Sequence, residues 1–146
     1  MEFFNIDPNP VYGINNPIGL KLLSRLRVGL SHLRSHKYQH RFDDTLSDTC
    51  TCFTNKSETV DHFLFHCPKY ALLRSELFEK LRKIISLVTL VSPLYFRNLL
   101  LYGSSIYKPH TNREIVELTI SFLISSSRFN GPLFTNGYFE RTSPFV

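Results

Sequence analysis

The chain has 146 residues, 42% of them apolar, with thirteen Phe and seven Tyr and a formal net charge of +5 at pH 7. This length corresponds to one domain with room for a hydrophobic core, and the composition argues against disorder. No apolar run reaches the roughly 18 residues of a membrane helix, and the opening MEFFNIDPNP is unlike a signal peptide. We therefore expect a soluble intracellular protein, cytoplasmic or nuclear and not secreted, with no membrane partner.

The first helix is expected just after a loosely structured lead-in over residues 1–15. Asn16 can cap this helix, and Pro17 suits its first position, where a missing N–H is harmless. A stripe of leucines at helical spacing follows: Leu22, Leu26, Leu30 and Leu33. Gly29 interrupts the pattern, so two shorter helices remain an alternative to one long helix.

The same segment carries an uneven charge, because no acidic residue lies between Asp7 and Asp43. A field of one sign favours a polyanionic partner, although a solvated helix face is the simpler interpretation. On a continuous helix, three arginines seven residues apart would span about 21 Å along a phosphate backbone. The residues predicted to bind nucleic acid are Lys21, Arg25, Arg27, Arg34, Lys37 and Arg41.

All three cysteines and one histidine then fall in the pattern C-x-C-x9-H-x4-C, made by Cys50, Cys52, His62 and Cys67. Three thiolates and one imidazole suit structural Zn²⁺, and a reducing compartment disfavours disulfides. The preceding residues have turn chemistry, and a short helix is expected from Thr59 to about His66. On an unbroken α-helix, His62 and Cys67 would point about 140° apart, so the helix should end between them, before Pro68.

Two features favour the alternative that the three cysteines are unligated thiols. The C-x-C spacing is tighter than the usual C-x2–4-C spacing of zinc knuckles. Phe53 also occupies the position after the second cysteine, where a zinc knuckle favours glycine. His66 is a rival ligand, four residues after His62 on the same helical face. If the ion is bound, the protein fills all four positions, which predicts a structural role. A second metal site at His32, His36 and His40 is disfavoured; we expect these histidines to be exposed or to contact phosphate.

The remaining elements are also helical. A helix from near Pro68 has one apolar face, made by Leu73, Leu77, Leu81, Ile84 and Val88. Ser92 and Pro93 begin another, which Gly103 could end. Thr111 and Glu114 have the spacing of a capping box for a last, largely buried helix, which NGPLF at 130–134 ends.

The predicted fold class is therefore mainly α: a small helical domain with an irregular zinc-binding insert. After the lead-in, residues 16–90 form the basic helix and the zinc-binding module. A C-terminal helical segment over 91–134 packs on this part, and a flexible tail follows over 135–146. RFDDT at 41–45 lacks the flanking apolar strands of a polymerase palm, and no catalytic triad or phosphate loop stands out. We expect no enzyme activity and no small-molecule substrate.

Two runs of the sequence resemble a known family. The run from Asn16 to Tyr70, with KLLSRLRVGLSHLRSHKY and CTC…HFLFHC, looks like the C-terminal region of reverse transcriptases of non-LTR (LINE-type) retrotransposons. The run from Leu99 to Phe134 resembles the end of those polyproteins, including the closing Arg-Phe-x-Gly-Pro-Leu-Phe. The likeness covers about residues 14–134.

The resemblance implies that Cys50, Cys52, His62 and Cys67 are metal ligands, and it places Lys21 to Lys37 in the basic helix of the family. Phe53 departs from the family pattern, which usually has glycine there. The polymerase and endonuclease of such an RNA-directed DNA polymerase would lie upstream. The chain would then be a fragment or remnant that helps to hold RNA or target DNA in target-primed reverse transcription. The alternative is a protein-interaction module that docks on the upstream polymerase domain.

Overall fold

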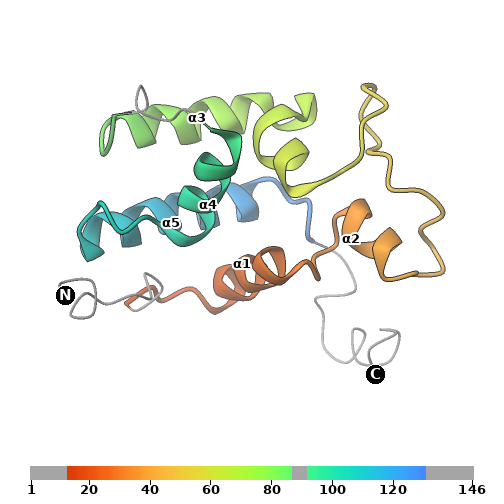
Figure 1. The fold of residues 1–146 in the computed structure, drawn as a ribbon, viewed down its shortest axis with the longest axis horizontal. Coiled ribbons are helices and arrows are strands. Elements are labelled where there is room, and N and C mark those ends of the chain that lie inside the picture. The colour runs from red at the N-terminus through yellow and green to blue at the C-terminus, as the bar shows by residue number, and fades with distance from the viewer. Residues whose placement is uncertain (1–12, 87–91, 131–146) are drawn as a thin grey trace.

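In the computed structural model, which describes residues 13–86 and 92–130, helices form the core of the protein (Figure 1). The α-helices are α1 (Pro17–Val28), α2 (Arg34–Gln39), α3 (Ala71–Arg82), α4 (Pro93–Tyr102) and α5 (Pro109–Ser125). A π-helix (His62–His66) and a 3₁₀ turn (Pro68–Tyr70) precede α3. Extended pairing in the described ranges amounts to one isolated bridge between Thr49 and Ser57. The predicted mainly α class is confirmed.

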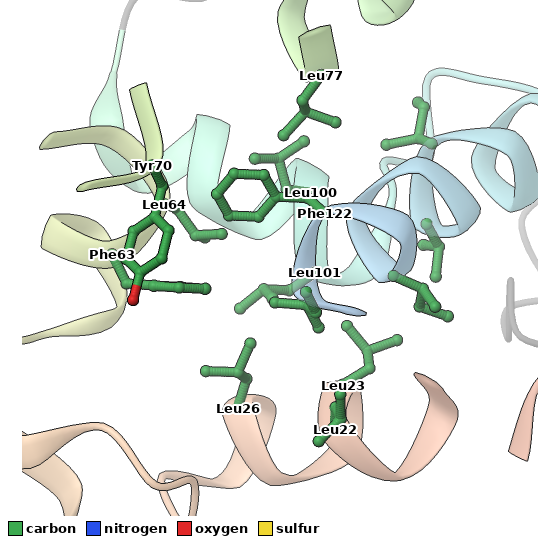
Figure 2. Close-up of a cluster of buried hydrophobic side chains, with 14 of the residues drawn as sticks. Leu22, Leu23, Leu26, Phe63, Leu64, Tyr70, Leu77, Leu100, Leu101 and Phe122 are labelled. Atoms are coloured by element: carbon green, nitrogen blue, oxygen red, sulfur yellow. The ribbon is translucent and has the colours of Figure 1, made fainter. Parts of the chain in front are cut away.

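Helix α5 is the centre of the fold, because it packs against α1, α3 and α4. Figure 1 shows it between α3 and α1, and Figure 2 shows Phe122 among leucines from the three other helices. One face of α5 is buried, with Ile115, Val116, Thr119, Ile120, Phe122 and Leu123, while Glu114 and Glu117 are exposed. The buried hydroxyl of Thr119 donates to the carbonyl of Leu100 at 2.8 Å, which fixes α4 against α5 without an unsatisfied polar group.

The packing of α1 on α5 requires a residue without a side chain at Gly19. This glycine is buried, and a Cβ atom there would collide with Cγ2 of Ile120. The two helices therefore approach each other closely at this point, and any larger residue would force them apart.

Helix α1 begins and ends as its sequence predicts. The side-chain oxygen of Asn16 accepts a hydrogen bond from the Gly19 amide at 2.9 Å. Gly29 ends the helix in the left-handed region, with φ +77°, which glycine adopts without steric penalty. The alternative of two shorter helices is thus the correct one. Leu30 lies in the connection and is half-buried, whereas Leu33 is fully buried.

The start of α5 differs from the prediction. Lys108 is the N-cap and Pro109 the first helical residue, so Thr111 and Glu114 lie inside the helix and form no capping box. The reason is Pro109: it suits a first helical position and holds the preceding residue extended, here at φ −70° and ψ 157°. The Thr-x-x-Glu spacing is correct for a capping box, but Thr111 stands three residues after the N-cap position at Lys108.

Helix α4 has the predicted ends, since the Ser92 hydroxyl accepts from the Tyr95 amide at 3.1 Å and Gly103 follows the last turn. The buried Asn112 of α5 then holds the connection between α4 and α5. Its side-chain oxygen accepts from the Ser104 amide at 2.9 Å, and its nitrogen donates to the Ser104 carbonyl at 2.8 Å.

The predicted helix near Pro68 begins with the 3₁₀ turn and continues as α3. Its apolar face is confirmed at Leu77 and Leu81, which are buried, while Leu73 and Ile84 are half-buried. Val88, most of the predicted lead-in, all of NGPLF except Asn130, and the predicted tail lie outside the described residues. The prediction that NGPLF ends the last helix is wrong, because α5 already ends at Ser125. Among the described helices, none is long and apolar enough to cross a membrane.

A buried ion pair connects the cysteine loop to the end of the described chain. Both carboxylate oxygens of Glu58 accept from the guanidinium of Arg128, each at 2.7 Å. One of these oxygens also accepts from the Arg34 amide at the start of α2, at 2.8 Å. Arg128 donates in addition to the His32 carbonyl at 2.9 Å. Three segments distant in sequence thus meet at one carboxylate, with Glu58 only 3% exposed.

We predict that Glu58→Gln lowers the free energy of unfolding by about 3 kcal/mol, because it leaves the Arg128 charge and the Arg34 amide with fewer acceptors in a buried site. Urea denaturation of the purified protein measures this. The matched control is Glu79→Gln, which breaks an exposed ion pair with Arg82 and should change stability by less than about 1 kcal/mol. Equal effects of the two substitutions would contradict the role assigned to Glu58.

Candidate metal centre

Cys50 and Cys52 lie in a hairpin-like loop that projects between α2 and the π-helix (Figure 1). The Cys50 amide donates to the Lys56 carbonyl at 2.7 Å, and the Glu58 amide donates to the Asp48 carbonyl at 2.8 Å. Asn55 turns the chain in the left-handed region at φ +59°, which asparagine tolerates better than most residues. These contacts fold a tight turn that directs both cysteine side chains inward, where they are buried.

His62 and Cys67 are the first residue of the π-helix and the residue that follows it. The Cys67 amide donates to the His62 carbonyl at 2.6 Å, five residues back, which is the hydrogen bond of a π-turn. This wider winding places the two side chains on one side, although an α-helix would separate them. The helix ends before Cys67, as predicted, and Cys67 is extended (ψ 122°) ahead of Pro68. The rival ligand His66 is exposed and lies outside the cluster.

The four predicted ligands come together in one buried cluster. Their ligand atoms all lie within 4.8 Å of one another. The Sγ atoms of Cys50 and Cys67 are 3.8 Å apart, and Sγ of Cys52 is 3.4 Å from Nε2 of His62. A tetrahedral zinc ion, with Zn–S of about 2.3 Å and Zn–N of about 2.0 Å, requires edges of about 3.8 and 3.5 Å. Two of the six edges therefore match those of a tetrahedral ion, and the remaining ligand atoms lie within 4.8 Å, close enough to converge on one divalent ion.

The protonation of the three thiols follows from their surroundings. Burial raises the pKa of Cys50 to about 12 and also raises the pKa of Cys67. The hydroxyl of Thr54, 3.0 Å from Sγ of Cys52, lowers the pKa of Cys52 to about 6. Without a cation, the two more buried sulfurs are neutral thiols, and a bound divalent ion would displace their protons.

The carbonyl groups of the π-turn are satisfied by an arginine that the sequence analysis did not single out. The guanidinium of Arg74 donates to the carbonyls of Leu64 (2.7 Å), Cys67 (2.8 Å) and Phe63 (3.2 Å). Because a π-turn leaves its carbonyls poorly paired, this residue stabilises the backbone that presents His62 and Cys67. Sequence spacing carries no signal for it, since Arg74 looks like one more basic residue of an amphipathic helix.

Aromatic packing attaches the π-turn to the core. Phe63 is fully buried, and its ring meets Tyr70 (5.1 Å) and Phe129 (5.3 Å) edge-to-face and the tilted ring of Phe122 at 5.3 Å. Edge-to-face contacts of this kind add to the area that aromatic rings bury. The π-turn, and with it the Cys/His cluster, thus packs against Phe122 of α5 and Phe129 of the segment that follows α5.

The three histidines at four-residue spacing do not form a second site. His32 is buried before α2 begins, and burial lowers its pKa to about 3, so it is neutral at physiological pH. His36 is half-buried, with Nδ1 2.7 Å from the Ser31 hydroxyl, and His40 is exposed. The expectation of exposure is therefore wrong for His32, because the break at Gly29 turns it into the core. Within the described ranges, the Cys/His cluster is the only group of three or more potential ligands.

The predicted nucleic-acid-binding residues differ in their exposure and in their contacts. Lys21 and Arg41 are exposed, while Arg25 and Arg34 are half-buried. Arg27 and Lys37 have partners within the fold. Arg27 donates to the Leu101 carbonyl at 2.8 Å and lies over the Tyr102 ring, and Lys37 pairs with Asp44 at 2.9 Å. Because the chain turns at Gly29, the arginines at 27, 34 and 41 do not form one straight row.

Comparisons with known proteins add no assignment: no protein-family model, no curated protein and no solved structure matches this chain. The likeness to non-LTR reverse transcriptases stays a prediction from the residues.

We predict that the purified protein binds one zinc ion per chain and that Cys67→Ser removes at least most of it, because three ligands bind zinc much more weakly than four. The control is His66→Ala, which changes an exposed histidine outside the cluster and should keep the ion. Elemental analysis after dialysis against a weak chelator measures both. Loss of zinc in His66→Ala, with retention in Cys67→Ser, would show that a different ligand set is used.

Proposed function

We propose that this chain is a non-catalytic nucleic-acid-binding module stabilised by a structural zinc ion. The observation that carries the proposal is the convergence of four buried ligand atoms within 4.8 Å, three sulfurs and one imidazole nitrogen. Three thiolates favour zinc over the hard cations, and the distances Cys50–Cys67 and Cys52–His62 suit its tetrahedral geometry. Because the protein supplies all four ligands, no open position remains for a substrate or an activated water.

The electrostatics of the surrounding surface support a polyanionic partner. Three of the carboxylates near the cysteine loop are engaged within the protein: Asp44 with Lys37, Asp48 with the Ser57 hydroxyl, and Glu58 with Arg128. Exposed basic side chains remain at Arg41, Lys56 and Lys69 in and near this loop and at Lys21 on α1, against the exposed carboxylate of Asp43. A surface with this excess attracts phosphate groups and gains affinity when it releases counterions.

We further propose that the chain derives from the C-terminal region of a non-LTR retrotransposon reverse transcriptase, as a fragment or remnant. The two runs that resemble this family, Asn16–Tyr70 and Leu99–Phe134, support this origin. The module would then help to hold RNA or target DNA during target-primed reverse transcription, while the polymerase chemistry belongs to the upstream domain.

A second candidate function is docking on that upstream polymerase domain. Exposed apolar side chains on two helices favour it: Leu72 on α3 is 83% exposed and Leu94 on α4 is 54% exposed. A docking surface of this kind would bind no free nucleic acid, so one experiment separates the two functions.

We predict that the metal-loaded protein binds unstructured single-stranded RNA or DNA, and that log K falls linearly with log salt concentration. Neutralising two exposed cations together, Lys21→Gln and Arg41→Gln, should weaken binding and reduce the slope by about 1.4, since each lost phosphate contact removes about 0.7. Fluorescence anisotropy of a labelled oligonucleotide across a salt series measures both quantities.

The control for this series is Lys83→Gln, which removes an exposed charge at the end of α3 and should leave the slope unchanged. Absence of binding by the unmodified protein at low salt would contradict the proposed function and leave the docking function. An equal change in slope for the control would show that binding depends on net charge alone.

A further inference from the structure

The side chain of Phe53 makes the cysteine loop unusual. It is 102% exposed, more than any other large apolar side chain in the described part of the chain. It directly follows the candidate ligand Cys52, near the tip of the loop between residues 48 and 58. A phenylalanine ring left in water contributes nothing to folding, because it does not gain the favourable free energy of transfer to an apolar environment. Its position therefore needs a reason other than packing.

The backbone beneath this ring is held in place. The Cys50 amide is bonded to the Lys56 carbonyl on the opposite side of the turn, and the Glu58 amide is bonded to the Asp48 carbonyl. The residues on either side of Phe53 contact each other: the Sγ atom of Cys52, which also contacts His62 in the Cys/His cluster, lies 3.0 Å from the Thr54 hydroxyl. A ring presented by such a fixed turn loses little conformational freedom when it binds a partner.

The surroundings of the ring are basic and polar. Lys56 is exposed on the same loop, and Nζ of Lys69 donates to the Thr51 hydroxyl at 2.9 Å, so its charge lies beside the loop. No acidic residue lies between Asp48 and Glu58, and both of these have partners within the protein. The residues flanking the ring, Thr51, Thr54 and Asn55, are exposed and polar.

We propose that Phe53 is a stacking residue for one base of a single-stranded nucleic acid, with Lys56 and Lys69 contacting the adjacent phosphates. A single aromatic ring beside cations matches a base and its phosphodiesters, the combination that single-strand binders use. A protein partner would require a continuous apolar patch, which the polar neighbours of Phe53 do not provide. Duplexes are disfavoured, because their bases are already stacked on each other. This inference rests on the proposed function and identifies the side chain that contacts the base.

Substitution of the ring separates stacking from charge. We predict that Phe53→Ala lowers affinity for an unstructured twelve-nucleotide single strand by about 5- to 150-fold, the range found for stacking aromatics. The salt slope should stay unchanged, because no phosphate contact is lost. Lys56→Gln with Lys69→Gln should instead reduce the slope. The matched control is Ile106→Ala, which removes an exposed apolar side chain from the connection between α4 and α5 and should leave affinity unchanged.

A direct readout is available because the chain contains no tryptophan. Phe53→Trp introduces a single indole at the tip of the loop, and stacking of a base on it should quench its fluorescence. Titration with the single strand should quench strongly, whereas the same sequence as a duplex should quench little. Zinc content and urea denaturation of each variant verify that the loop is still folded.

The outcomes separate this inference from the proposed function. If the unmodified protein binds the single strand and Phe53→Ala binds it equally well, the stacking role is wrong while nucleic-acid binding stands. The same holds if Phe53→Ala only abolishes self-association in sedimentation, which would assign the ring to a second copy of the chain. If the unmodified protein binds no nucleic acid at all, the proposed function itself is wrong.

Discussion

The convergence of four buried side chains on one small volume is the constraint on which the rest of the structure depends. The segment from Asp43 to Ser57 is polar and has few apolar residues of its own with which to fold. Its two cysteines meet His62 and Cys67 at distances that suit a tetrahedral ion. A divalent ion there would supply the free energy that a hydrophobic core supplies elsewhere. The position of the exposed loop residues, including Phe53, depends on this cluster together with the hydrogen bonds across the turn.

Two arginines connect the cluster to the helical core. Arg74 satisfies the carbonyls of the π-turn, and Arg128 forms a buried pair with Glu58 at the base of the cysteine loop. Glu58 also accepts a hydrogen bond from the Arg34 amide at the start of α2. The same carboxylate therefore holds both α2 and the base of the cysteine loop. A change at the cluster should therefore be felt at α2, which leads directly to the exposed Arg41 assigned to nucleic-acid binding.

Much of the fold could be predicted from local sequence. Asn16, Gly29, Ser92 and Gly103 mark helix ends through backbone chemistry that acts within a few residues, and the four candidate ligands follow from residue type and spacing. The π-turn could not be predicted, because an α-helical rule separates His62 from Cys67 and only tertiary packing selects the wider winding. The roles of Arg27, Arg74 and Arg128 also depend on partners distant in sequence, and the pattern of basic residues does not distinguish structural arginines from exposed ones.

X-ray absorption at the zinc edge tests the central claim most directly. The account predicts a four-coordinate ion with three sulfur neighbours at about 2.3 Å and one nitrogen neighbour at about 2.0 Å. A folded protein that is purified under reducing conditions with zinc present, yet holds no metal, would contradict it. A spectrum dominated by oxygen and nitrogen neighbours would contradict it as well, because the three thiols would then be ordinary buried groups.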